Sequence, residues 1–146
     1  MKRFFLALAT IALMAGNILA DDNLVEIPFN KIPDLGQRTV QSYFPSNKVV
    51  KAVKNKTKDM KNRTCVLLDN DATIEFDKDG HWMIVDCRSA SVPMRMVPGK
   101  IQMYLSKNHP GADVVYMGRE IKNGDLTLLL NDGTELHFTN EHTIIK

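Results

Sequence analysis

The sequence predicts an α+β protein in which one helix and an antiparallel meander of strands occur twice. The first observation is an internal repeat: Pro45, followed by Val49-Val50, recurs as Pro110, followed by Val114-Val115, 65 residues further on. The second is the alternation of apolar and polar residues in short runs bounded by turn residues, which is typical of antiparallel strands. Each repeat is therefore expected to contain a helix and then a group of paired strands.

A proline opens each predicted helix. Pro33 suits a first helical turn, and the helix should end near Phe44, because the residue before Pro45 avoids helical backbone angles. Pro98 opens the second helix in the same way. The predicted strands are residues 48–56, 63–69, 72–77 and 81–87 in the first repeat, then 113–120, 125–131 and 134–139 in the second, with a further short strand at 142–145.

Two turns set the register of the predicted strands. Asp77-Lys78-Asp79-Gly80 fits a type I turn closed by a glycine at positive φ, and Asp132-Gly133 fits a two-residue type I′ turn. The expected cross-strand pairs are Phe76 with Trp82, Ile74 with Ile84, Phe76 with Cys65, Ile74 with Leu67, and Leu129 with Leu136. We expect the face that contains these residues to pack on the helices.

The alternate residues define a candidate protein-binding surface on the other face of the sheet. Most of them are apolar, and a large apolar patch on a soluble protein is typical of an interaction site. The candidate residues are Val66, Leu68, Glu75, Met83, Val85, Leu128 and Leu130. Two alternatives stay open: the segment Leu24 to Phe29 covers this face, or a register that differs by one residue moves the apolar set to the helix side.

The first twenty residues predict a cleaved secretory signal. Lys2 and Arg3 precede an uncharged apolar run from Phe4 to Ala15, and small residues follow up to a predicted cut after Ala20. The alternative, a membrane anchor, is disfavoured because a spanning helix needs roughly 20 apolar residues. We therefore expect a periplasmic or secreted protein with no stable membrane insertion after signal cleavage.

The charge balance and the two cysteines indicate which partners and which covalent bonds to expect. The chain has 19 basic and 17 acidic residues, and removal of Lys2 and Arg3 with the signal leaves the two signs equal, so no nucleic-acid partner is expected. The predicted register places Cys65 on the helix face and Cys87 on the other face. We expect no disulfide between them, although an exported protein could form one.

The run Ile74-Glu75-Phe76-Asp77-Lys78-Asp79-Gly80-His81-Trp82, with Tyr43-Phe44-Pro45, Val92-Pro93 and the repeat, resembles the beta-lactamase-inhibitor-like, PepSY-like family of exported bacterial proteins. The resemblance implies one curved antiparallel sheet with helices on one face, similar to beta-lactamase inhibitory protein, and no enzyme activity. It implies a PepSY-like domain over residues 21–146, with repeat one at about 27–92 and repeat two at about 93–146. The free sheet face of such proteins can hold another protein, and related PepSY domains are thought to restrain peptidases.

The acidic turn is a candidate metal site. Glu75, Asp77 and Asp79 alternate before Gly80, a spacing that imitates a calcium loop, but the flanking residues alternate as strands and not as helices. The alternative is an Asp-rich hairpin turn whose side chains bind their own backbone. No cofactor is expected apart from Ca²⁺ under this hypothesis.

The sequence has no recognisable catalytic or zinc motif, and its four histidines are scattered. We therefore predict a non-enzymatic periplasmic protein-binding module, an inhibitor or regulator of a hydrolase being one form, that acts through the free face of its sheet. The alternative is a calcium-responsive periplasmic binding protein. The expected partner is another protein, and the chain is expected to be a monomer or weak homodimer.

Overall fold

The computed structural model describes residues 23–58, 62–88 and 90–146. The predicted signal segment, residues 1–20, lies outside the described residues. The strands are β1 (Leu24–Glu26), β2 (Val49–Asn55), β3 (Thr64–Leu68), β4 (Thr73–Phe76), β5 (Trp82–Asp86), β6 (Val114–Arg119), β7 (Leu126–Leu130) and β8 (Glu135–Phe138). The helices are α2 (Asp34–Tyr43) and α3 (Gly99–Asn108), preceded by the 3₁₀ helices η2 (Phe29–Lys31) and η4 (Met94–Met96).

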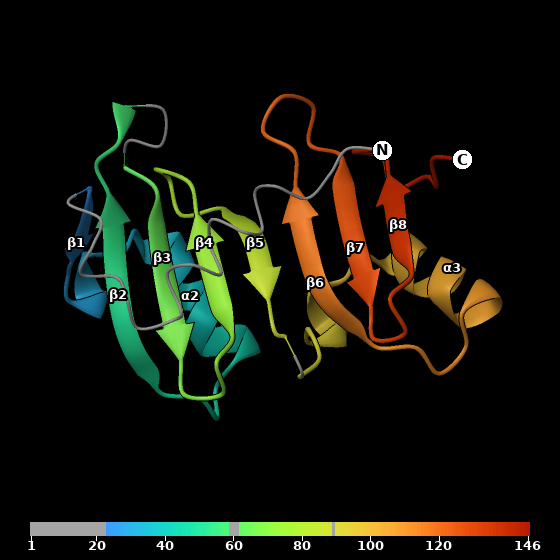
Figure 1. Cartoon of the computed structure of the whole chain (residues 1–146), viewed down its shortest axis with the longest axis horizontal. Helices are drawn as coiled ribbons and strands as arrows, with labels where there is room; N and C mark the ends of the chain where they lie inside the picture. The colour runs from blue at the N-terminus through green and yellow to red at the C-terminus, as the bar shows by residue number, and fades with distance from the viewer. Residues whose placement is uncertain (1–22, 59–61, 89) are drawn as a thin grey trace.

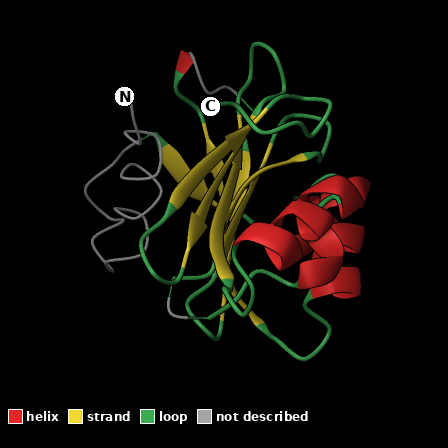
Figure 2. Cartoon of the chain, turned by 90° about the vertical axis from the view of Figure 1, so that its right-hand side faces the viewer, coloured by secondary structure: helices red, strands yellow, loops and turns green. Residues whose placement is uncertain are grey.

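The eight strands form one antiparallel sheet in which the spatial order is the sequence order (Figure 1). Both helices lie on one side of this sheet (Figure 2). In Figure 1 α2 lies behind β3 and β4, and α3 lies beside β8 at the other end of the sheet. The predicted α+β class, with helices on one face of an antiparallel sheet, is confirmed.

The two helices begin in the same way. Pro33 and Pro98 precede them at φ −52° and −54°, angles that suit entry into a helix, and neither proline has an N–H to satisfy. The side chain of Gln37 donates to the carbonyl of Ile32 at 2.7 Å, and Gln102 donates to the carbonyl of Val97 at 2.8 Å. Corresponding residues, 65 apart, therefore fasten each helix to the 3₁₀ turn before it.

Three of the hairpins have loops of three residues. The N–H of Leu68 bonds to the carbonyl of Ala72, that of Asp77 to His81 and that of Leu130 to Thr134. In each loop the last residue has positive φ: Asp71 at 67°, Gly80 at 92° and Gly133 at 90°. This is the usual geometry of a type I turn followed by a left-handed residue.

These loops correct the predicted register by one residue. Asn131 belongs to the last loop, so the turn is not the predicted two-residue type, and Leu136 lies opposite Leu128 instead of Leu129. Asp71 takes a backbone angle that favours glycine, and Ile74 consequently lies opposite Val66 instead of Leu67.

The prediction for the middle hairpin holds at Phe76, which pairs with Trp82. A bulge then passes over Met83, so that Ile74 pairs with Val85 and not with Ile84.

The helices cover the face that contains Phe76 and Phe138. A Cβ added at Gly36 of α2 would lie 3.3 Å from the Phe76 ring, and Tyr104 of α3 contacts the Phe138 ring edge-on at 5.5 Å between centroids. The core on this side joins helix residues to alternate residues of the strands. It includes Val40, Val66, Leu68, Ile74, Phe76, Val85, Ile101, Leu105, Leu128, Leu130 and Phe138.

The predicted apolar docking surface is therefore wrong. Five of its seven residues lie in the helix-side core with exposed fractions of 0 or 1%: Val66, Leu68, Val85, Leu128 and Leu130. Met83 is also buried, at the β5 bulge. A slip of one residue exchanges the two faces of a strand, and it does so here in β3, β5 and β7. Glu75 keeps its predicted place on the face away from the helices, opposite Cys65.

The ends of the sheet also differ from the prediction. Leu24–Glu26 is a strand, β1, that pairs with β2 through Val25 and Lys54, whereas the sequence suggested only a segment that covers the sheet. The predicted strand at 142–145 is reduced to a single bridge between Phe138 and Ile144.

Candidate functional site

The sheet face away from the helices, called here the bare face, is built from two rows of cross-strand neighbours. The first row runs from β2 to β8 through Val53, Cys65, Glu75, Ile84, Gly118, Thr127 and His137. The second runs through Lys51, Leu67, Thr73, Asp86, Tyr116, Leu129 and Glu135. Polar and ionisable residues make up more than half of the two rows, in contrast to the apolar core on the helix side.

An ion pair occupies the middle of the first row. Arg63, which lies just before β3, pairs through its guanidinium with the carboxylate of Glu75 in β4, and both side chains are nearly buried. Cys65 lies opposite Glu75. Burial raises the pKa of the Cys65 thiol, the charge of Glu75 raises it further and that of Arg63 lowers it. This thiol is therefore protonated and unreactive at neutral pH.

Asp86 is the second carboxylate at the centre of the bare face. It is 7% exposed in the 146-residue chain, and its Oδ1 accepts a hydrogen bond from the N–H of Arg88 at 3.1 Å. Among the described residues, no cationic side chain forms an ion pair with Asp86. Its neighbour on β4, Thr73, is 1% exposed, and the Thr73 hydroxyl has no hydrogen-bond partner among the described residues.

Tyr116 lies opposite Asp86 on the β6 side. Its ring lies over Gly118, because a Cβ added there would lie 2.7 Å from the Tyr116 hydroxyl oxygen and 3.1 Å from two ring carbons. Burial raises the pKa of Tyr116 to about 12, and the negative charges of Asp86 and Glu75 add to the effect. The phenol therefore stays protonated and can donate a hydrogen bond throughout the physiological range.

A hydrogen-bonded set ends the rows at β7 and β8. The Thr127 hydroxyl lies 3.1 Å from Nδ1 of His137, and Nε2 of His137 lies 2.8 Å from a carboxylate oxygen of Glu135. This set was not predicted from the sequence, and neither were Arg63, Thr73, Asp86 and Tyr116, because only the true register shows which side chains share the bare face. The side chain of His137 is half exposed, so this set belongs to the rim of the face.

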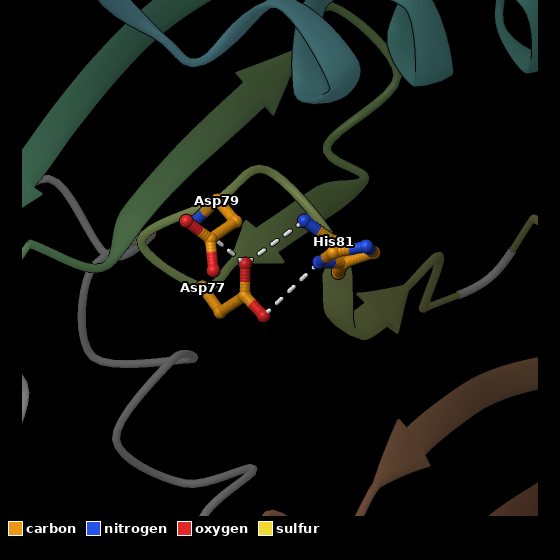
Figure 3. A group of neighbouring side chains, drawn as sticks. All are labelled: Asp77, Asp79 and His81. Carbon is orange, nitrogen blue, oxygen red and sulfur yellow. Dashed lines mark hydrogen bonds and ion pairs between the residues drawn. The ribbon is translucent and has the colours of Figure 1, made fainter.

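The predicted metal site is only partly assembled. Asp77, Asp79 and His81 offer ligand atoms within 4.8 Å of one another in the hairpin between β4 and β5 (Figure 3). Glu75 does not join them, because its carboxylate pairs with Arg63. Oδ1 of Asp77 accepts the N–H groups of Asp79 and His81, each at 2.9 Å, and Oδ2 lies 3.4 Å from Nδ1 of His81.

This geometry fits an Asp-rich turn better than a calcium loop. Calcium takes six to eight oxygen ligands, whereas the hairpin offers two carboxylates and an imidazole, and one oxygen of Asp77 already serves the backbone. The residues therefore do not complete a calcium shell.

The cysteines lie on opposite faces, but the other way round from the prediction. Cys65 is on the bare face and Cys87 is in the helix-side core, fully buried. Neither is in a disulfide. Burial raises the pKa of Cys87 to about 12, with a further contribution from Asp86.

In the described part of the chain, both helices lie on one side of a single antiparallel sheet and the other side is polar. This arrangement defines a class of helix-backed sheet proteins. The family model "Putative beta-lactamase-inhibitor-like, PepSY-like" matches residues 61–146. The chain belongs to this PepSY-like family, as the resemblance in the sequence indicated.

Solved structures with the same fold come from Bacteroides. A protein of Bacteroides thetaiotaomicron described as a "putative calcium-regulated periplasmic protein" is 33% identical, with a TM-score of 0.80 over 86% of this chain and 96% of that one. A putative periplasmic protein of Bacteroides vulgatus is 30% identical, with a TM-score of 0.78 over 86% and 96% of the two chains. A second from that organism, of unknown function, is 27% identical, with a TM-score of 0.77 over 84% and 97%.

No curated protein matches the sequence. Within the part of the chain that the structure describes, neither helix has the length and apolar character needed to cross a membrane.

Proposed function

We propose that this chain is an exported, non-enzymatic protein-binding module of the periplasm that inhibits or regulates a hydrolase, and that the bare face is its binding surface. The family description and the periplasmic proteins of the same fold support this assignment. The observation that carries it is the gathering of Arg63, Glu75, Asp86 and Tyr116 at the centre of a face that neither helix covers (Figure 2).

The energies of these polar groups favour a role in recognition over a role in stability. Ionisable side chains in the middle of a sheet lose hydration, and apolar residues of the same size usually serve stability as well or better. Charged groups at a protein interface instead contribute specificity and faster association, because they select a partner of complementary charge. A polar bare face is therefore more useful to recognition than to folding.

The experiment is site-specific photo-cross-linking in exporting cells. A photoreactive amino acid replaces Leu129, which is half-buried on the bare face, and in a matched control it replaces Met103, which is 72% exposed on α3. The proposal predicts a discrete cross-linked partner from position 129 and none from position 103. Equal patterns from both positions, or no product from position 129, would refute the binding role of the bare face.

A second candidate function is a calcium-responsive role for the β4–β5 hairpin. It is favoured by the description of the Bacteroides thetaiotaomicron protein and by the proximity of Asp77, Asp79 and His81, although water would have to complete the shell. Calorimetric titration with millimolar CaCl₂ tests it against the variant Asp77→Asn/Asp79→Asn. Heat that the variant abolishes supports this function, and the absence of heat from the parent chain rejects it.

A further inference from the structure

We propose that the centre of the bare face binds a lysine or arginine side chain of the partner protein, held by the Asp86 carboxylate and the Thr73 hydroxyl. This inference rests on the proposed function and specifies the chemistry of its partner. It is independent of the hairpin residues Asp77 and Asp79.

The first observation is that only one of two carboxylates on the same face has a counter-charge. Glu75 is neutralised by Arg63, whereas no described residue supplies a cation to Asp86. Both acids are more than nine-tenths buried in the 146-residue chain. A buried carboxylate without a counter-charge is strongly disfavoured, so a cation from another molecule would relieve a real energetic penalty.

The second observation is the Thr73 hydroxyl beside Asp86. Thr73 and Asp86 are direct cross-strand neighbours, and neighbouring Cβ atoms on one face lie roughly 5 Å apart. The Thr73 Oγ1 atom is buried and lacks a hydrogen-bond partner within the described structure. Buried polar atoms are nearly always satisfied, so an unused acceptor next to an unpaired carboxylate indicates an absent donor.

The chemistry of the pair favours an amine or guanidinium over a metal ion. A lysine ammonium has three donors and a guanidinium has five, and a carboxylate with one hydroxyl can receive several of them. A calcium ion would need six to eight oxygen atoms, and the other buried carboxylate of this face, Glu75, is paired with Arg63.

Tyr116 completes the subsite. It lies opposite Asp86, and its ring lies over the backbone at Gly118. A cation bound to Asp86 would lie beside this aromatic ring, and aromatic faces attract ammonium and guanidinium groups.

The direct test is a titration of isotopically labelled protein, exported and purified after processing, with an end-blocked trilysine peptide as the probe. Backbone amide shifts identify the site. The variants are Asp86→Asn, which keeps an acceptor for the Arg88 N–H but removes the charge, and Thr73→Val, which removes the hydroxyl at constant shape. Glu141→Gln is the control, because it removes one exposed carboxylate that belongs to neither the bare face nor the hairpin.

We expect the peptide to shift the amides of Thr73, Asp86 and Tyr116 in the parent chain. Binding should be roughly 30-fold weaker in Asp86→Asn, because truncation of one partner of a desolvated charge pair has effects of this size or more. It should be several-fold weaker in Thr73→Val and within twofold of the parent in Glu141→Gln. Shifts centred elsewhere, or equal binding by Asp86→Asn, would overturn the proposal.

A second arm uses CaCl₂ alone. If calcium shifts the same three amides at lower concentration than the peptide, and Asp86→Asn abolishes that response, the site binds a metal ion and the proposal is wrong. The absence of a calcium response at these amides, together with peptide binding, supports an amine-binding site.

Cross-linking in cells separates this inference from the proposed function. If Leu129 captures a partner and capture persists in the Asp86→Asn background, the binding function stands and the lysine or arginine subsite is rejected. If nothing is captured from Leu129 but the peptide still binds at Asp86, the bare face binds cations without the proposed protein partner.

Discussion

Replacement of two adjacent leucines in β7 gives the sharpest test of the register. Leu128 is fully buried in the helix-side core, opposite Leu136, whereas Leu129 is half-buried on the bare face. Leu128→Ala removes three carbon atoms from the core, or ~2.4 kcal/mol at ~0.8 kcal/mol per buried methylene, and the remaining cavity brings the total to ~3–5 kcal/mol. Leu129→Ala should lower the free energy of unfolding by ~1 kcal/mol or less, since its side chain is already partly hydrated.

Urea denaturation of both variants measures the difference. Domains of this size have free energies of unfolding of ~5–15 kcal/mol, so Leu128→Ala should lower the urea midpoint by roughly a fifth or more, with an unchanged slope. The sequence-based register predicts the opposite order, because it places Leu129 in the core. A larger loss for Leu129→Ala than for Leu128→Ala would refute the register of β7 and the assignment of the two faces.

Three further predictions concern the central strands. Gly118→Ala should destabilise the fold by ~1–3 kcal/mol, because the new Cβ would collide with the Tyr116 ring, and a double-mutant cycle with Tyr116→Ala should recover most of the loss; additive effects would contradict this contact. The pKa of Tyr116 is raised from 10.0 to about 12 in the fold, so its contribution to stability is complete below pH 10 and is lost as the pH rises through about 12. Urea midpoints of the parent chain should therefore fall relative to those of Tyr116→Phe between pH 10 and 12, and parallel curves would count against the buried phenol. Finally, the thiol of Cys87 should resist an aromatic disulfide reagent at pH 8 in the native chain and react fully in urea; rapid reaction of the native thiol would place Cys87 outside the core.

Local sequence signals were sufficient to predict the elements and the fold class. Pro33 and Pro98 mark the helix starts, and the alternating runs mark seven of the eight strands. β1 escaped notice because three residues offer too little periodicity. Helices and strands depend mainly on residues that are close together in the chain, so a single sequence is enough to predict them.

One residue in each loop determines which side chains of the neighbouring strands point toward the helices. Asp71 adopts a positive φ without being a glycine, and Asn131 joins a loop that Asp132-Gly133 could have closed alone. In both loops the register is selected by the packing of the apolar strand residues against the helices, which is a tertiary effect. The bare-face residues Asp86 and Tyr116 were missed for the same reason, since their proximity exists only in the correct register.

A structure of this chain bound to the protein that it captures would show whether the bare face is the binding surface. We expect the partner to cover the bare face across β3 to β7 and to place a lysine or arginine side chain against Asp86. A partner seated instead on the outer surface of α2 and α3, with Asp86 and Tyr116 uncovered, would contradict this expectation.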